Sequence, residues 1–241
     1  MNILITGGAS GLGIAITRVL ANDAYNTVYF TYNKSVENAK LIASECTNTI
    51  GIHCDFTDTA STAELLEKMS KMDLDALINN AFWGTPVKTY FHKIPLSEFS
   101  ADFTNYLLPT IQITQAAISI FRKKKKGKII TVLTSILVNT PPIGTSVYVA
   151  NKAYLQSLVK SWATENSHFG ISSNSVSPSF MLTNLTADVD HRILEQMINS
   201  HPLKQLLTTN EAADAVLYLA NASAQVNGID ILLNAGVNLK Q

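Results

Sequence analysis

The sequence predicts an α/β protein with a doubly wound parallel sheet of about seven strands and helices on both of its faces. Seven short apolar runs alternate along the chain with stretches of helical periodicity, and strands that alternate with helices are joined by right-handed crossovers into a parallel sheet. Several of these runs are apolar at successive positions rather than at alternate ones, as is typical of strands covered on both faces.

The expected elements follow one another without interruption. We expect strands at 2–6, 27–32, 50–56, 74–81, 128–135, 172–178 and 230–236. Helical periodicity is clearest at 13–22, 61–72 and 210–221. No linker, internal repeat or low-complexity tract divides the chain, so we expect a single domain over residues 1–241.

The run FRKKKKGK at 121–128 is the one cluster of charge in the sequence. It follows a helical pattern, and cations in a last helical turn interact favourably with the negative end of the helix dipole. We expect Gly127 to be the C-cap of this helix. The alternative is a basic patch that binds a partner such as an acidic carrier protein.

Charge and composition argue against several classes of function. Eighteen basic side chains balance eighteen acidic ones, so no net field attracts nucleic acid or an anionic membrane. No segment is apolar enough to span a bilayer, and the start lacks the features of a signal peptide. Cys46 and Cys54 suit a reducing compartment, so we expect a cytoplasmic protein. The histidines, at 53, 92, 168, 191 and 201, have no metal-ligand spacing, and we expect no metal site.

Two turns at the start of the chain predict a dinucleotide site. In ITGGASGLGIA (5–15), Gly7 permits a tight turn, while Gly11 and Gly13 let a ligand approach the backbone and a helix pack on the sheet. The alternative is a tight turn that binds nothing. After the second strand, Asn33, Lys34 and Ser35 stand where NAD sites usually carry an acid. A cation with small donors suits a 2′-phosphate and favours NADP over NAD, although a plain polar turn would read the same.

Tyr148 and Lys152 lie four residues apart, which places them on one face of a helix. Both side chains could simply extend their polar tips from a packed helix into water. Alternatively, the ammonium lowers the pKa of the phenol, so that the phenol exchanges a proton near neutral pH.

The chain resembles the short-chain dehydrogenase/reductase family in its compact, single-domain, Rossmann-type form. The likeness rests on the spacing of Thr6-Gly7-x-x-x-Gly11-x-Gly13 and on CDFTD (54–58), NNAF (79–82), VSPS (176–179) and NGIDILLNAG (227–236), in the family's order. The resemblance implies cofactor contacts at Gly7, Ser10, Gly11, Leu12, Gly13, Asn33, Lys34, Ser35, Asp55, Phe56, Asn80, Ala81, Tyr148, Lys152, Pro178, Met181 and Thr183.

The same resemblance implies four catalytic residues: Asn105, Ser135, Tyr148 and Lys152. Tyr148 would exchange the proton, Lys152 would favour the phenolate and hold the nicotinamide ribose, and Ser135 would hydrogen-bond the substrate oxygen. Pro109 has no N–H for the Asn105 carbonyl, which the family uses to hold a water of a proton relay.

Two positions depart from the family pattern. Phe82 replaces a glycine and is followed by Trp83, and Ser179 replaces another glycine. A large ring at position 82 either turns into the core or, with Trp83, forms part of the substrate wall.

The resemblance implies an NADP-dependent oxidoreductase that acts on a small carbonyl/alcohol pair, with a substrate lid around 180–206. His191 and His201 fall in this lid, where a surface position is favoured over a substrate contact. Two alternatives stay open: a reductase of 3-oxoacyl groups on acyl carrier protein, and a sensor or scaffold that binds NADP without turnover. We also expect a homotetramer or dimer, because the helices that carry Asn105 and Tyr148 offer apolar positions beyond one core face.

Overall fold

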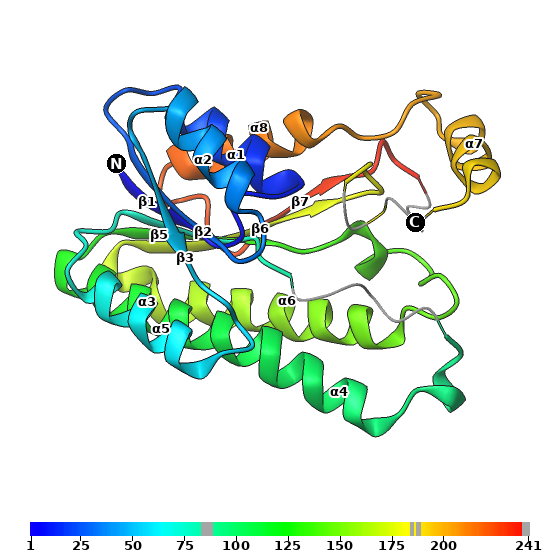
Figure 1. The fold of residues 1–241 in the computed structure, drawn as a ribbon, viewed down its shortest axis with the longest axis horizontal. Helices are drawn as coiled ribbons and strands as arrows, with labels where there is room; N and C mark the ends of the chain where they lie inside the picture. The colour runs from blue at the N-terminus through cyan, green and yellow to red at the C-terminus, as the bar shows by residue number, and fades with distance from the viewer. Residues whose placement is uncertain (83–88, 184–185, 187–188, 238–241) are drawn as a thin grey trace.

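Seven parallel strands form one sheet in the order β3-β2-β1-β4-β5-β6-β7. The computed structural model describes residues 1–82, 89–183, 186 and 189–237. This topology confirms the predicted doubly wound parallel sheet (Figure 1). The strands are β1 (Asn2–Ile5), β2 (Thr27–Tyr32), β3 (Thr49–His53), β4 (Ala76–Asn79), β5 (Gly127–Val132), β6 (Ile171–Pro178) and β7 (Asp230–Leu233).

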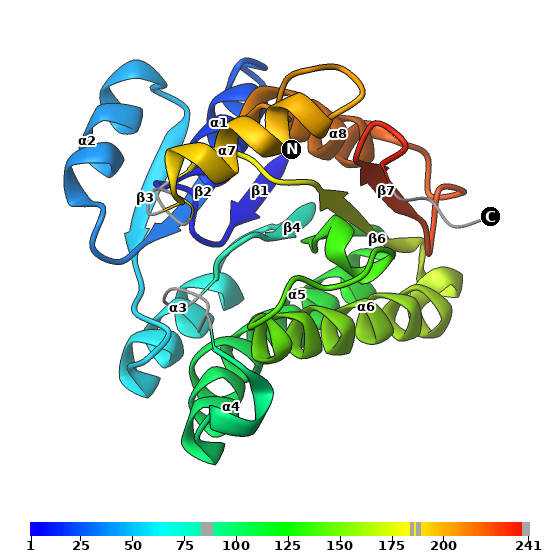
Figure 2. The same cartoon turned by 90° about the vertical axis from the view of Figure 1, so that its right-hand side faces the viewer.

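Helices cover both faces of the sheet. One face carries α1, α2 and α8, and the other carries α3, α5 and α6 (Figures 1 and 2). In the part of the chain that the structure describes, no helix is long and apolar enough to cross a membrane. The α-helices are α1 (Leu12–Ala21), α2 (Val36–Glu45), α3 (Thr59–Ser70), α4 (Leu96–Asp102), α5 (Leu108–Lys124), α6 (Ser146–Asn166), α7 (His191–Ser200) and α8 (Thr209–Asn221).

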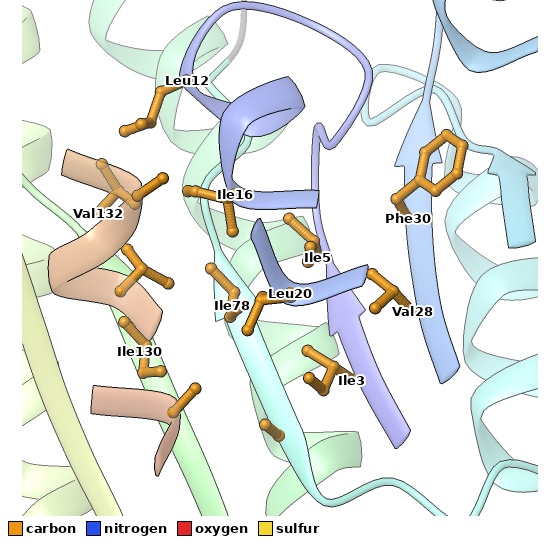
Figure 3. Packing of buried hydrophobic residues seen from close by; sticks show 14 of the residues in the cluster. Ile3, Ile5, Leu12, Ile16, Leu20, Val28, Phe30, Ile78, Ile130 and Val132 are labelled. Atoms are coloured by element: carbon orange, nitrogen blue, oxygen red, sulfur yellow. The ribbon is translucent and has the colours of Figure 1, made fainter. Parts of the chain in front are cut away.

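The central strand β1 is apolar on both sides because each side faces its own core. Ile3 and Ile5 pack with α1 and α8 on one face, where Figure 3 shows them beside Leu20. Leu4, between them, packs with α3 and α5 on the other face. All three β1 side chains are fully buried, and each contributes about 1.5–3 kcal/mol of hydrophobic stabilisation. This two-sided burial explains why the sequence runs apolar at successive positions.

The order of the strands reverses between β1 and β4. The chain proceeds from β1 through β2 to β3 at one edge, and then crosses to β4 on the other side of β1. The loops that follow β1 and β4 therefore leave in opposite directions and open a crevice at the carboxyl ends of these strands, where α/β proteins bind ligands.

The lysine-rich run differs from its predicted form in one respect. Arg122, Lys123 and Lys124 occupy the last turn of α5, as expected, but the C-cap is Lys125, which adopts a left-handed conformation with φ 53°. Gly127 instead begins β5, where a Cβ would lie 2.2 Å from Cγ of Phe121. The glycine at position 127 is therefore required by the close packing of α5 on β5. It is not required by the geometry of a helix cap.

Candidate active site

A cavity of about 1060 Å³ lies at the carboxyl ends of the strands. Its walls come from the segments that directly follow all seven strands, so residues far apart in the sequence meet here. Of the predicted site residues, Gly13 and Asn105 do not line it. Those that do are Gly7, Ser10, Gly11, Leu12, Asn33, Lys34, Ser35, Asp55, Phe56, Asn80, Ala81, Ser135, Tyr148, Lys152, Pro178, Met181 and Thr183.

The turn between β1 and α1 brings a helix N-terminus to the cavity. Gly7 and Gly11 adopt positive φ values of 67° and 50°, and α1 begins at Leu12 on the cavity wall. Free N–H groups of the first helical turn bind anions such as a diphosphate. Packing requires glycine at position 13, because a Cβ there would lie 2.0 Å from the Gly7 carbonyl oxygen. The turn therefore fits a dinucleotide.

Hydrogen bonds hold this turn against the end of β4. The backbone N–H groups of Asn80 and Ala81 donate to Oγ1 of Thr6 over 3.0 and 3.1 Å. Nδ2 of Asn80 donates in turn to the carbonyl oxygens of Thr6 and Gly7, over 3.0 and 3.1 Å. The polar groups at the switch point are thereby satisfied by one another, and the loop backbone that faces the cavity is fixed.

The turn after β2 lines one end of the cavity. Asn33, Lys34 and Ser35 form it, and Lys34 is exposed to solvent. Asp55, which follows β3, is the only carboxylate among the described residues of the cavity wall. It accepts hydrogen bonds from the backbone N–H and the hydroxyl of Thr57, over 2.9 and 2.8 Å. These bonds lower the pKa of Asp55 and keep it ionised at neutral pH.

Ser135, Tyr148 and Lys152 all line the cavity, and Nζ of Lys152 lies 5.9 Å from the centroid of the Tyr148 ring. Ser135 does not end β5 as expected: β5 stops at Val132, and Ser135 opens the short 3-10 helix Ser135–Leu137. Ser135 is buried and lines the cavity. Tyr148 is partly exposed, and burial raises the pKa of its phenol. A lowered pKa was one of the two alternatives that the Tyr148–Lys152 spacing offered.

The hydrogen bonds of Lys152 go to two neutral groups, and neither of them is Tyr148. Nζ of Lys152 donates hydrogen bonds to the carbonyl oxygen of Val132 over 2.8 Å and to the hydroxyl of Tyr106 over 3.0 Å. Among the residues that the structure describes, no carboxylate lies within ion-pair distance of Lys152. The side chain is only 3% exposed, and burial lowers its pKa from 10.5 to about 7.

Phe82 stands between the two tyrosines. Its ring makes edge contacts with Tyr106 and Tyr148, at centroid distances of 4.8 and 5.2 Å. The residue lines the cavity and also packs against the core on the α5–α6 side of the sheet. The two expected placements of this ring are thus both partly realised. Ser179 lines the cavity too, and Trp83 lies outside the described residues.

Asn105 lies in a π-helical turn, Phe103–Leu107, between α4 and α5. The backbone N–H of Leu108 reaches back to the carbonyl oxygen of Phe103, five residues earlier. Pro109 follows with no N–H, so the Asn105 carbonyl lacks the donor that an ordinary helix would give it. Asn105 is half-buried and does not line the cavity, so its predicted role stays a prediction.

The segment predicted as a lid contributes to the far wall. Met197, Ser200 and His201, at the end of α7, line the cavity, whereas His191 is 81% exposed. The expectation of a surface position therefore fits His191 but not His201. Residues 184–185 and 187–188 of this segment lie outside the described residues. Whether the segment closes over a substrate stays a prediction.

Tyr106 was not predicted as a site residue, although its hydroxyl contacts Lys152. It reaches Lys152 only because the π-helical turn places its ring in the core between α5 and α6. No spacing rule signals a contact between residues 46 positions apart. A tyrosine directly beside Asn105, in an otherwise apolar stretch, was the one local clue.

Comparison with known proteins assigns the family. A family model described as "Enoyl-(Acyl carrier protein) reductase" matches residues 7–238. The chain is 27% identical to 3-oxoacyl-(acyl-carrier-protein) reductase FabG of Staphylococcus aureus (strain Mu50 / ATCC 700699), over 97% of this chain and 96% of that protein. It is also 27% identical to D-beta-hydroxybutyrate dehydrogenase of Rhizobium meliloti (strain 1021), with the same coverage.

Solved structures agree with this assignment. A structure titled "short chain dehydrogenase/reductase family protein" matches with a TM-score of 0.84 and 29% identity, over 98% of this chain and 96% of that one. The fold is also similar to YwfH, titled as an NADPH dependent reductase, with a TM-score of 0.86 and 21% identity, over 98% and 97% of the chains. The chain belongs to the short-chain dehydrogenase/reductase family of NAD(P)-dependent oxidoreductases.

Proposed function

We propose that this protein uses NADP(H) to interconvert a carbonyl compound and the corresponding alcohol at Ser135, Tyr148 and Lys152. The observation that carries this proposal is the continuity of the cavity. It runs from the glycine-rich turn at Gly11, past Asn80, to Tyr148 and Lys152. A ligand bound by its diphosphate at one end therefore has its reactive end beside a phenol and a lysine at the other.

Bound NADPH supplies the hydride to the carbonyl carbon, and the protein supplies the proton and the positions of the reactants. Ser135 donates a hydrogen bond to the substrate oxygen, where negative charge grows. Tyr148 then gives its proton to that oxygen, and the alcohol forms. Lys152 would hold the nicotinamide ribose hydroxyls and stabilise the phenolate. The Asn105 carbonyl would support the proton relay that reprotonates this phenolate.

The preference for NADP over NAD rests on Asn33, Lys34 and Ser35. These residues line the cavity, and none of them is acidic. A 2′-phosphate would therefore meet a cation and small hydrogen-bond donors without repulsion at this turn.

The substrate side of the cavity favours a largely apolar molecule. Ile136, Phe82, Met181, Met197 and Leu206 contribute apolar surface to its wall, beside polar residues such as Asn139 and Ser200. The FabG relatives are reductases of 3-oxoacyl groups, so a 3-oxoacyl thioester is the second candidate substrate. The run at 121–128 does not support an acyl carrier protein as its carrier. Lys124 pairs with Asp73 and Asp75, beside the amino end of β4 and away from the cavity mouth.

One assay separates these functions. NADPH oxidation is followed at 340 nm with simple ketones and aldehydes, an acetoacetyl N-acetylcysteamine thioester, and the same acyl group on acyl carrier protein. Turnover of the simple carbonyls supports the proposal. A strong preference for either 3-oxoacyl thioester favours the second candidate, and a further preference for the carrier-bound form identifies its carrier. NADPH binding without turnover of any substrate favours a sensor.

A further inference from the structure

Tyr106 is buried next to Lys152 and does not line the cavity. It ranks among the largest buried side chains of the described residues and is 2% exposed. A buried tyrosine hydroxyl needs a hydrogen-bond partner. The partner here is Nζ of Lys152, at 3.0 Å.

The ammonium of Lys152 has a defined set of neighbours. Two of its three donors are used by the Tyr106 hydroxyl and the Val132 carbonyl oxygen, which leaves one for a ligand in the cavity. Three aromatic rings surround it, with centroids 5.3 Å (Tyr106), 5.5 Å (Phe82) and 5.9 Å (Tyr148) from Nζ. These distances are within the range of cation–π attraction. The three rings and the two acceptors together hold the ammonium group, a role that a carboxylate plays for many buried lysines.

We propose that Tyr106 is a positioning residue: its hydroxyl fixes the Lys152 ammonium between β5 and the π-helical turn, and so controls how strongly Lys152 acts on Tyr148. The inference rests on the proposed roles of Lys152 and Tyr148. It adds to them a second phenol, which touches neither substrate nor cofactor in this scheme and acts only through the lysine.

The physical consequence concerns the charge of Lys152. Burial already lowers the pKa of this lysine to about 7, so the charged form depends on the acceptors that remain. Removing the Tyr106 hydroxyl leaves one buried N–H without an acceptor and disfavours the ammonium further. In the pH range in which Lys152 is charged, this loss of positive charge makes ionisation of the Tyr148 phenol less favourable.

The other titratable groups around the lysine are few. Tyr148 faces it from α6, and Tyr106 from the π-helical turn. Asp102, at the end of α4, accepts a hydrogen bond from Nδ2 of Asn151 over 2.9 Å. Asn151 is the residue that precedes Lys152 in α6. Burial raises the pKa of Asp102.

The test compares Tyr106→Phe with Tyr218→Phe. Phenylalanine keeps the ring that packs on Phe82 and removes only the hydroxyl. Tyr218 is 56% exposed on α8, on the opposite face of the sheet, and serves as the matched control. In protein labelled with 13C at lysine Cε, we expect the NMR titration midpoint of Lys152 to fall by about one pH unit in Tyr106→Phe. We expect no change in Tyr218→Phe.

A kinetic readout follows with any substrate found active. We expect kcat to fall about tenfold in Tyr106→Phe, and the pKa of the alcohol-oxidation profile to rise. In a Lys152→Ala background, Tyr106→Phe should change turnover by less than twofold, because the group through which it acts is gone.

An unchanged Lys152 midpoint together with an unchanged pH profile would overturn the proposal, as would full additivity with Lys152→Ala. If no substrate is turned over, the proposed function fails, but the NMR titration still decides whether Tyr106 controls Lys152. If Tyr106→Phe does not fold, Tyr106→Met removes the same hydroxyl with a side chain that fills irregular core space, and the same titration applies.

Discussion

Nδ2 of Asn80 donates a hydrogen bond to the carbonyl oxygen of Gly7 over 3.1 Å, although 73 positions separate the two residues. The bond joins the loop after β4 to the glycine-rich turn after β1, on either side of the switch point. The same amide group also reaches the carbonyl oxygen of Thr6. One side chain thus couples the end of the cavity that suits a diphosphate to the end that holds Tyr148.

Asn80→Ala should weaken both the fold and cofactor binding. Two carbonyl oxygens lose their donor, which costs about 1–3 kcal/mol of unfolding free energy. We expect about tenfold weaker NADPH binding, measured by fluorescence titration, and a lower Tm. Asn221→Ala is the control, because Asn221 is exposed at the end of α8 and bonds only its own helix. Equal losses in the two variants would contradict the coupling.

Tyr148→Phe should separate binding from chemistry. The variant keeps the ring beside Phe82 and loses the transferable proton, so cofactor affinity should stay within twofold while turnover falls by about a hundredfold or more. A variant that turns over within a few-fold of the parent enzyme would show that the phenol only extends from a packed helix.

Lys152→Ala should differ in kind from Tyr148→Phe. It removes the cation and the contact to the ribose together, so kcat and NADPH affinity should both fall. The double variant should lose far less turnover than the product of the two single losses, because the residues act as one unit. Steady-state kinetics and NADPH titration of the three variants measure this, and additive losses would speak for independent roles.

NADPH should bind more tightly than NADH. Lys34→Asp replaces the cation of the turn after β2 by a group that repels a 2′-phosphate and accepts from a 2′-hydroxyl. We expect NADPH affinity to fall about tenfold or more and NADH affinity to hold or rise. Equal affinities of the parent for the two cofactors, or an unchanged NADPH affinity in Lys34→Asp, would refute the assignment. Lys40→Asp, at an exposed position of α2, controls for the change in net charge.

Stability should depend on pH through Lys152. The pKa of this base is lowered to about 7 in the folded protein from 10.5, so above pH 7 the unfolded chain binds more protons than the folded one. Unfolding free energy therefore rises with pH in this window, by at most about 1.4 kcal/mol per pH unit. Urea unfolding at pH 7.0, 7.8 and 8.5 should show this rise in the parent relative to Lys152→Met. A constant difference would mean that the lysine titrates normally.

The protein should form a dimer or tetramer through the α4–α6 side. Phe103 and Tyr154 contact each other at a centroid distance of 6.1 Å, and both stay exposed, at 39% and 44%. Light scattering should give a multiple of 26.2 kDa, and Tyr154→Glu should lower it, whereas Tyr218→Glu should not. A parent mass of a single chain at micromolar concentration would rule out this assembly.

Local pattern alone determined the architecture. Apolar runs predicted most of the strands, because a strand covered on both faces has no polar side to display, as β1 shows with Ile3, Leu4 and Ile5. The exception is β6, which is mostly serine and asparagine although all of its residues are buried. The glycines of the first turn were equally readable, because positive φ at Gly7 and Gly11 is a property of the backbone at those positions. The Tyr148–Lys152 spacing likewise placed both residues on one cavity wall through the geometry of a single helix.

Contacts between distant segments were decided only by the tertiary structure. The sequence predicted an interaction of Lys152 with Tyr148, but the π-helical turn brings the Tyr106 hydroxyl to the ammonium. Phe82, which stands at a glycine position of the family, places its ring between Tyr106 and Tyr148. The C-cap of α5 is Lys125 and not the predicted Gly127. Gly127 is needed instead in β5, where the ring of Phe121 leaves no room for a Cβ. A helical period or an apolar run reports which face of an element is buried. The contacts between individual side chains in that core depend on the packing of the whole chain. The spacing of residues along one segment does not predict these contacts.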